Sequence, residues 1–489
     1  MSQFYTPFDH FALMPAIILA LFGCAILLFD FLLPPDPKQC KLLMLLTVVG
    51  LVISGIGLWR QQTFLAASGN DVLIAFNGAL TIDRFALFFN WVFEIASLIV
   101  VIVSYKYLDI EGEHHGEYYS LILFAQCGMF FLAAGTDLVT LFIGLELMAL
   151  CFYVMVGFLR GEKRSNEAAI KYLLLGAFSS GFLVYGFSIL YGLAGSTRLK
   201  DVEAAIAALD TWNPVVFLAV ATTSVGLLFK ISAVPFHMWA PDAYEGAPTT
   251  ITAYLSVASK AASFAFLLRI FLGPLASARD AWQPLLAAVA IATMTIGNLA
   301  AVSQSNIKRL LAYSSISHAG YMLLGLIAGN DTGIQGIMVY ILVYAFMNLG
   351  AFTVVIAMRR KGIIGEDLDD MAGLMYTSPG YAVLMLVFLL SLAGIPPTAG
   401  FLGKYYIFLS LIQTHHYVLA VIATLYVAVA LYYYFRIVKT MFVGELAEKT
   451  APATSFGLRL ALGITGLLTL AIGIYPEPIL RMTQGSILK

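Results

Sequence analysis

Long apolar runs separated by short polar stretches follow one another along the whole chain. Each run has about 20 residues, the length at which an α-helix crosses the hydrocarbon core of a bilayer, and about fourteen such segments are predicted. They begin near Phe11, Lys41, Asp83, Glu117, Asp137, Asn166, Asn213, Pro248, Ala281, Asn306, Gly333, Pro379, His415 and Ser455. The pattern therefore predicts an all-α membrane protein that crosses the bilayer many times.

Two of the polar connections carry patterns of their own. Between Asp71 and Asp83, short apolar runs flank Asn77-Gly78, the residue pair favoured in two-residue hairpin turns. Between Lys200 and Asp210, apolar residues recur at the spacing of a short amphipathic helix. We expect a β-hairpin and a surface helix on the outer side, and no large domain outside the membrane.

Composition supports a membrane protein and excludes several other classes. The chain has 489 residues, of which 61% are apolar and 11% are charged, and its net charge is −1. A soluble domain of this size would need far more surface charge, and a nucleic-acid partner is not indicated. The four cysteines are scattered, and no glycine-rich phosphate loop follows a strand. We therefore expect no metal, iron–sulfur cluster or nucleotide in this chain.

Basic residues in the loops predict the orientation of the chain. With the amino terminus outside, the inner loops hold roughly twice as many lysines and arginines as the outer ones, as the positive-inside rule requires. Both termini are then on the outer side, which is the periplasm in a bacterial plasma membrane. The first apolar segment lacks a basic start and a small-residue cleavage site, so it is expected to remain as a helix.

Two helix breaks indicate an internal repeat. Ser232-Ala-Val-Pro235 in the seventh segment has a counterpart in Ala393-Gly-Ile-Pro396 of the twelfth. Helices 4–8 and 9–13 would then form two five-helix units, and an odd helix number makes the second unit inverted. The expected divisions are 1–116, 117–272, 281–443 and 455–489. The alternative is coincidence between two common small-residue motifs.

Six ionisable residues lie within apolar segments of the two units. They are Glu146, Lys171, Lys230, Lys260, His318 and Lys404. A charge at mid-bilayer costs roughly 2.5–3.5 kcal/mol even on lenient scales. Six such charges can be tolerated if their side chains face one another across a hydrated interior. This arrangement indicates an ion path.

Glu146 needs a cationic partner, and Lys230 is the partner that we expect. At about 5.5 Å and an effective dielectric near 20, such a pair couples by ~3 kcal/mol. Burial favours the neutral amine of a lysine and a close carboxylate favours the ammonium, so moving the carboxylate loads or releases a proton. The alternative is a static ion pair that fixes helix packing.

The other ionisable residues have competing interpretations. Lys260 lies among serines and alanines that allow close helix approach, which favours a relay. His318 and His237 can pass protons through either ring nitrogen, or act only as interior hydrogen-bonding groups. Lys171 is near its helix start, where it can extend to the inner surface. Glu94, outside both units, pairs with a neighbouring subunit or lines a local cavity.

Two motifs resemble those of a known family. Residues Lys230-Ile-Ser-Ala-Val-Pro-Phe-His-Met-Trp-Ala-Pro-Asp-Ala-Tyr-Glu-Gly-Ala-Pro-Thr249 and Asn306-Ile-Lys-Arg-Leu-Leu-Ala-Tyr-Ser-Ser-Ile-Ser-His-Ala-Gly-Tyr321 are similar to signatures of the antiporter-like subunits of respiratory complex I. The resemblance covers nearly the whole chain. Three features favour the N-type branch. No long lateral helix follows segment fourteen, and segment twelve carries Lys404 where the M-type subunit has a glutamate. The first three helices, which animal mitochondrial counterparts lack, are present.

The resemblance implies roles for individual residues. Glu146 and Lys230 match the coupling pair, Lys260 the central lysine and Lys404 the lysine near the outward half-channel. His237, His318 and Lys171 also fall on positions carried in N-type subunits, whereas Glu94 departs from the pattern.

The implied function is proton translocation coupled to redox changes in partner subunits. FMN, iron–sulfur clusters and quinone are expected in those partners and not in this chain. The expected neighbours are an M-type antiporter-like subunit, small K-, J- and A-type subunits, and lipids. Two alternatives are a subunit of a multi-subunit cation/proton antiporter without a redox link, and a structural spacer whose charges only hold helices together.

Overall fold

The computed structural model describes residues 6–33, 37–210, 212–360, 365–444 and 452–487. Among the described residues, twelve helices are long and apolar enough to cross a membrane, and two shorter apolar helices accompany them. Together these helices match the predicted segments one for one. Lys361, Lys449 and Lys489, which contributed to the loop-charge pattern, lie outside the described residues.

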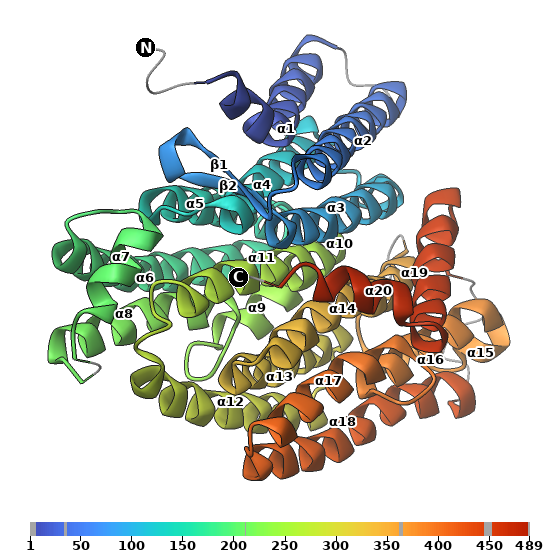
Figure 1. The fold of residues 1–489 in the computed structure, drawn as a ribbon. Helices are drawn as coiled ribbons and strands as arrows, with labels where there is room; N and C mark the ends of the chain where they lie inside the picture. Colours follow the sequence, from blue (N-terminus) through green and yellow to red (C-terminus); the bar gives the residue numbers. More distant parts are fainter. Residues whose placement is uncertain (1–5, 34–36, 211, 361–364, 445–451, 488–489) are drawn as a thin grey trace.

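The spanning helices follow the chain in order (Figure 1). They are α1 (Pro7–Leu32), α2 (Pro37–Ser68), α3 (Arg84–Glu111), α4 (Gly116–Ala134), α5 (Leu138–Val156), α6 (Lys163–Ala194), α8 (Pro214–Lys230), α10 with η2 and α11 (Thr249–Leu272), α12 (Arg279–Val302), α13 (Ile307–Ala328), α14 (Asp331–Met358), α16 (Pro379–Ala393), α18 (Tyr417–Val443) and α19 (Phe456–Ile474). The shorter helices are α7 (Leu199–Ala207), α9 (Trp239–Gly246), α15 (Leu374–Thr377), α17 (Ala399–Gln413) and α20 (Glu477–Gln484), and the short turns are η1 (Phe76–Gly78) and η3 (Leu368–Met371).

Three spans form the centre of the molecule. α14 is buried along its whole apolar window, and the spans Thr249–Leu272 and Ile307–Ala328 are almost as fully enclosed. By contrast, α1, α6 and α18 leave most of their apolar windows exposed, as expected for helices that face lipid. At one end of the molecule α1 and α2 lie beside α3 and α4 (Figure 1). Polar groups on the central helices are therefore shielded from lipid on all sides.

Both predicted helix breaks are present. α8 ends at Lys230, and residues 231–238, which include Pro235, separate it from α9. α16 ends at Ala393, and residues 394–398, which include Pro396, separate it from α17. Proline lacks an N–H and crowds the preceding turn, so it ends a helix here as the sequence predicted.

A third irregularity was not predicted from the sequence. The span that begins at Thr249 contains a π-helical turn, η2 (Leu255–Ser259), and Lys260 follows it directly. Such turns insert one extra residue into a helix and often occur at functional sites. The side-chain amide of Asn348 donates to Ser256 Oγ within this turn (2.7 Å).

The predicted hairpin and surface helix are confirmed. β1 (Val72–Ala75) pairs antiparallel with β2 (Leu80–Asp83). The connection is longer than the two-residue turn that we expected, because Phe76 joins Asn77 and Gly78 at positive φ. α7 occupies the stretch predicted to be an amphipathic helix. The hairpin is also joined to α11, because the buried Arg269 of α11 is ion-paired with Asp83 (2.9 Å).

Candidate functional site

Lys230 lies at the last turn of α8, beside the first helix break. Its side chain is buried, and its ammonium is 3.4 Å from the hydroxyl of Tyr153 on α5. The expected partner Glu146, two turns earlier on α5, is half-buried and accepts a hydrogen bond from Ser180 Oγ (2.5 Å). Glu146 acts electrostatically on Lys230, but the two make no ion pair within 4.0 Å. The carboxylate and the amine are therefore not in direct contact, and the Tyr153 hydroxyl lies next to the amine.

Lys260 occupies the centre of the molecule. Its amine donates to the carbonyl oxygen (2.7 Å) and to the hydroxyl (2.5 Å) of Ser315 on α13. The side chain is only 3% exposed and has no ion-pair partner among the described residues. Because the π-turn precedes Lys260, the extra residue changes the direction in which the lysine leaves its helix. A buried amine held only by neutral groups can exist with or without its third proton.

His318 lies one turn of α13 after Ser314 and has a tyrosine at each ring nitrogen. Nδ1 is 2.5 Å from the hydroxyl of Tyr340 on α14, and Nε2 is 3.1 Å from that of Tyr434 on α18. Tyr434 also makes a 2.5 Å hydrogen bond with Ser314. An imidazole between two hydroxyls can accept a proton on one side and donate one on the other.

Lys404 of α17 reaches back to the second helix break. Its amine donates to the carbonyl oxygens of Leu392 (3.0 Å) and Ala393 (2.8 Å), at the end of α16. Carbonyls in the last turn of a helix lack intrahelical partners and carry partial negative charge, so they stabilise a cation. Gly394 has φ +86°, and a Cβ there would lie 2.8 Å from the Lys404 side chain. The break thus supplies both the acceptors and the room for the lysine.

These residues form a series of polar groups through the central helices. Lys260 bonds to Ser315, the adjacent Ser314 bonds to Tyr434, and Tyr434 bonds to His318. Lys404 Nζ lies 5.1 Å from the centre of the Tyr321 ring, and that ring is 6.5 Å from the ring of His318.

Between Lys230 and Ser315 the described residues supply a series of contacting aromatic rings in place of a continuous hydrogen-bonded route. The rings belong to Tyr153, Tyr172, Trp239 and Tyr244, and the Tyr244 hydroxyl is 3.4 Å from Ser315 Oγ. A proton passing from Lys230 to Lys260 would therefore need water or a rearrangement of these rings.

Two predicted residues lie outside this series. His237 is in the first break, half-buried, with its Nδ1 buried and unpaired. Lys171 differs from the expectation of a residue within the apolar interior, because its side chain is 47% exposed and pairs with Glu167 (2.8 Å) and Asp242 (3.0 Å). Its position near the start of α6 places it at the surface, where carboxylates are available.

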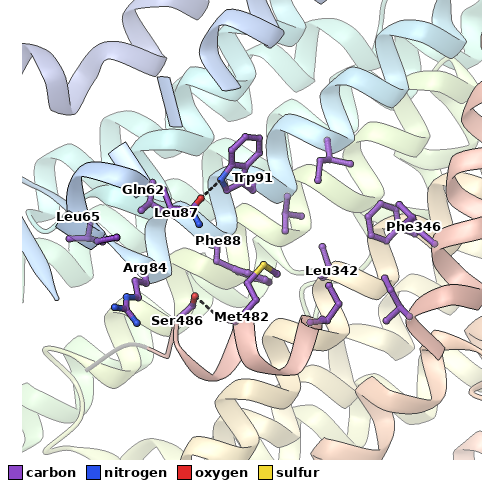
Figure 2. A pocket seen from close by; sticks show the side chains of 16 residues that line it. Gln62, Leu65, Arg84, Leu87, Phe88, Trp91, Leu342, Phe346, Met482 and Ser486 are labelled. Carbon is purple, nitrogen blue, oxygen red and sulfur yellow. Dashed lines mark hydrogen bonds between the residues drawn. The ribbon is translucent and has the colours of Figure 1, made fainter. Parts of the chain in front are cut away.

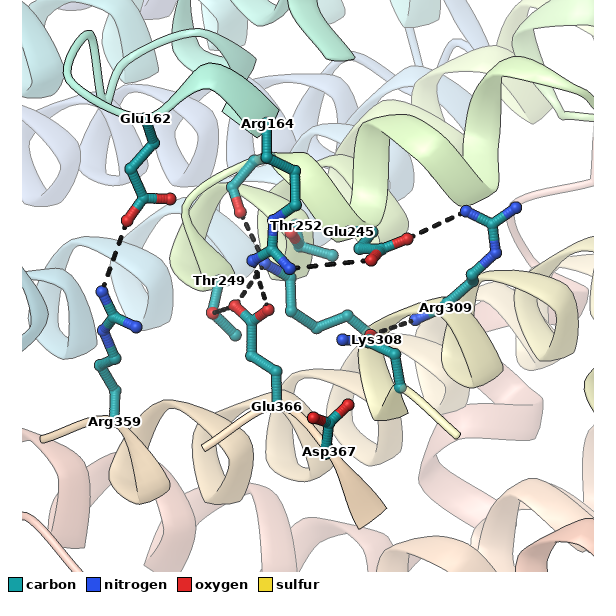
Figure 3. A network of polar contacts seen from close by, with 12 residues as sticks. Glu162, Arg164, Glu245, Thr249, Thr252, Lys308, Arg309, Arg359, Glu366 and Asp367 are labelled. Carbon is teal, nitrogen blue, oxygen red and sulfur yellow. Dashed lines mark hydrogen bonds and ion pairs between the residues drawn. The ribbon is translucent and has the colours of Figure 1, made fainter. Parts of the chain in front are cut away.

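Lys171 instead belongs to an ion network that the sequence did not reveal. Figure 3 shows the part of this network around Glu366, with Arg164, Glu245, Lys308 and Arg309. Asp242 and Glu245 of α9 both bind Arg309 of α13, each at 2.9 Å. Arg164 of α6 links Glu245 (3.7 Å) to Glu366 (2.6 Å), and Glu366 also binds the buried Lys308 (2.8 Å). The network joins α6, α9 and α13 to the connection that precedes η3.

Glu366 is the buried anion of this network and lies outside the spanning helices. Burial by itself would raise the pKa of its carboxyl, but Lys308 and Arg164 outweigh that effect and hold the pKa below its ordinary value of 4.5. Its carboxylate is therefore ionised at neutral pH. The motif Asn306-Ile-Lys-Arg contains two cations of the network, Lys308 and Arg309, but no sequence pattern indicated which carboxylates bind them.

An apolar cavity lies apart from the buried lysines and the ion network. About 650 Å³ in volume, it is bounded by α2, α3, α14, α19 and α20, with Trp91, Phe346 and Met482 among its lining residues (Figure 2). None of the buried lysines or His318 lines it. Among the described residues no group of three or more His, Cys, Asp or Glu side chains is arranged to hold a metal ion.

Comparison with known proteins identifies related chains. Residues 135–429 match the family model described as NADH:quinone oxidoreductase/Mrp antiporter, TM. A protein of Solibacter usitatus named NADH-quinone oxidoreductase subunit N 2 is 74% identical, over 100% of this chain and 99% of its own length. A Koribacter versatilis protein named NADH-quinone oxidoreductase subunit N 1 is 52% identical, over 98% of this chain and 95% of its own.

Solved structures agree with these relatives. A chain of respiratory complex I from Thermus thermophilus superposes with a TM-score of 0.78 at 32% identity, covering 96% of this chain and 98% of that one. A chain of the Mrp complex from Dietzia superposes with a TM-score of 0.83 at 21% identity, covering 97% of both. The second likeness shows the fold alone.

Proposed function

The chain belongs to the subunit N family of NADH-quinone oxidoreductases, and from that premise we propose that protons cross it by way of Lys230, Lys260, His318 and Lys404. Its function is that of a proton-translocating subunit in the membrane arm of complex I, next to other membrane subunits. The observation that carries the proposed route is that two hydrogen-bonded groups, Lys260–Ser315 and Ser314–Tyr434–His318, meet at the adjacent residues Ser314 and Ser315 of α13.

The input to this route is the pair Glu146 and Lys230. A conformational or electrostatic signal from partner subunits would change their separation, and so change whether the Lys230 amine keeps its proton. Driving one charge against 100 mV costs about 2.3 kcal/mol, which is close to the ~3 kcal/mol that a pair of charges about 5.5 Å apart supplies at an effective dielectric near 20. His237 and Lys171 lie at the edges of the route and would serve entry of protons or positioning of α9.

The two halves of the route would correspond to two inverted five-helix units, 117–272 and 281–443, flanked by 1–116 and 455–489. The support is that each unit contains one helix broken at a proline, with a buried lysine at the break. Lys230 ends the first half-helix of its pair, and Lys404 lies in the second half-helix of its pair. Broken helices at matching positions are typical of transport sites.

In this proposal the chain holds no redox centre. FMN, iron–sulfur clusters and quinone would be bound by partner subunits, and both termini would face the periplasm, as the basic residues of the inner loops indicate.

The test replaces Lys230 with alanine in the assembled complex. Because the proposed switch is then lost, most of the proton pumping driven by NADH oxidation should disappear in proteoliposomes, while the complex still contains the subunit. Lys200→Ala, at an exposed position of α7, is the matched control. Full incorporation with unchanged pumping would exclude Lys230 from the route. Purification without flavin and iron–sulfur partners would instead favour a cation/proton antiporter.

A further inference from the structure

Glu94 is a buried carboxyl group that the proton route does not use. It lies in the middle of α3, only 6% exposed, within the three helices that precede the proposed units. Among the described residues it makes no ion pair, and the groups that bind it are neutral. Ser54 Oγ of α2 donates to its Oε2 at 3.2 Å, and Gln126 Nε2 of α4 donates to the same oxygen at 2.5 Å.

Two acceptor atoms of this pair have no donor in the described part of the chain. Glu94 Oε1 and Gln126 Oε1 are both buried, and neither has a hydrogen-bond partner among the described residues. Buried polar atoms without partners are rare, and two on a single pair of side chains that already bond to each other point to a common cause. Each atom is an acceptor, so one additional hydrogen between the two side chains would satisfy both of them.

A proton on Glu94 supplies that hydrogen. A carboxylic acid has one O–H donor and one carbonyl acceptor, and a primary amide has the complementary set, so the two groups can form a ring with two hydrogen bonds. The structure already shows one of them, from Gln126 Nε2 to Glu94 Oε2. The O–H of Glu94 Oε1 would donate to Gln126 Oε1. Exchanging the amide nitrogen and oxygen of Gln126 would bring two oxygens to 2.5 Å, which again requires a proton on Glu94.

The surroundings favour the neutral acid over the carboxylate. A buried charge without a counter-ion is one of the most expensive arrangements in a protein, and apolar residues adjoin Glu94 on its own helix. Trp91 and Ile95 line the apolar cavity on that side of α3 (Figure 2). Gly55 of α2 faces Glu94 and Trp91, and a Cβ placed at Gly55 would make ordinary van der Waals contact with both, so α2 also presents an apolar surface to Glu94 here.

We propose that the paired side chains of Glu94 and Gln126 form a proton-binding site that stays occupied during turnover, separate from the lysine route. The bound proton joins α3 to α4 through the acid–amide ring, and Ser54 adds a bond from α2. Neither of the two alternatives left open by the sequence is then required: Glu94 needs no partner from a neighbouring subunit and no water-filled cavity.

Infrared difference spectroscopy of the assembled complex at neutral pH tests this proposal. The spectrum of the wild type minus that of Glu94→Gln should show the C=O band of one protonated carboxylic acid. Gln126→Leu should keep that band and shift it to higher frequency, because the acid loses its amide partner. Glu117→Gln, at an exposed position of α4, is the control and should remove a carboxylate band instead. Loss of a carboxylate band from Glu94→Gln would overturn the proposal.

A transport measurement gives an independent result. Glu94→Gln is an uncharged mimic that forms an amide–amide ring with Gln126, so the variant complex should assemble and pump protons like the wild type. Glu94→Ala leaves Gln126 and Ser54 without an acceptor and should lower the amount of subunit incorporated. Loss of pumping by fully incorporated Glu94→Gln would show that the carboxyl must ionise, contrary to the proposal.

Discussion

At the scale of single residues, the buried lysines differ in the groups that accept their hydrogen bonds. Lys260 is held by a serine and Lys404 by two carbonyl oxygens, whereas Lys230 has a tyrosine hydroxyl and a carboxylate nearby. Among the described residues, none of these three lysines has a carboxylate in direct contact, so none of the three is fixed as a permanent cation by an ion pair, unlike Lys308. This makes a change of protonation less costly than in a tight salt bridge.

Tyr434 is the residue whose removal should break the central series. Tyr434→Phe removes one hydroxyl that bonds to both Ser314 and His318. A net hydrogen bond contributes about 1 kcal/mol, so the two bonds contribute about 2 kcal/mol together. Because a tenfold change of rate corresponds to about 1.4 kcal/mol, we expect pumping to fall by roughly 30-fold. Tyr118→Phe is the matched control, because Tyr118 is equally buried and its hydroxyl bonds to Ser104 and Thr250 instead. Equal pumping by the two variants would remove Tyr434 from the route.

Gly394 gives a second test at this scale. A left-handed conformation costs a residue with a Cβ roughly 1–2 kcal/mol, and the added methyl would also displace Lys404 from the end of α16. Gly394→Ala should therefore reduce both the thermal stability of the complex and its pumping. Gly380→Ala, with open space around its Cβ, should change neither. A normal pumping rate in Gly394→Ala would mean that the position of Lys404 is unimportant.

At the scale of elements, the sequence predicted the features that are rare within membrane-spanning segments. Charges and prolines within apolar runs are costly, so Glu146, Lys230, Lys260, His318 and Lys404 stand out from the amino-acid sequence alone. The hairpin was predicted because Asn77 and Gly78 tolerate positive φ. These signals are local, and each depends on a few neighbouring residues.

Partners contributed by distant helices were not predictable in this way. Tyr340 and Tyr434 are two of 25 tyrosines, and tyrosine in an apolar helix is ordinary. Their roles follow from α14 and α18 packing against α13, which no local pattern encodes. The π-turn before Lys260 was not predicted for a related reason: its hydrogen bond from Asn348 comes from another helix. For Lys171 the sequence left open a place in the interior or at the inner surface, and the exposed side chain, paired with Glu167 and Asp242, agrees with the second alternative.

At the scale of the whole molecule, the ion network and the proposed proton route share helix α13. α13 carries Lys308 and Arg309 of the network as well as Ser315 and His318 of the route, and α9 follows the break at Lys230. A movement of α9 relative to α13 would therefore affect both. The network connects helices of the two proposed units, and its contribution to stability can be tested because that contribution depends on pH.

Glu366 has a lower pKa in the folded chain than its ordinary value of 4.5. Its contribution to stability is therefore complete above that value and is lost as the pH falls through the lower, folded pKa. Glu366→Gln leaves Lys308 buried without its counter-ion, so the loss at neutral pH should be about 3–5 kcal/mol. The difference in thermal midpoint between wild type and variant should shrink on acidification below about 4.5. Asp369→Asn, an exposed neighbour, is the control; a difference that persists in acid would contradict the assignment.

The most direct test of the route is the number of protons pumped per NADH oxidised by the complex with Lys260→Met. Methionine keeps the volume of the lysine and removes the amine that bonds to Ser315. The account predicts a lower ratio for Lys260→Met and an unchanged ratio for Lys200→Met on the exposed face of α7. A wild-type ratio in a complex that contains the Lys260→Met subunit in full amount would contradict a proton route through the centre of this molecule.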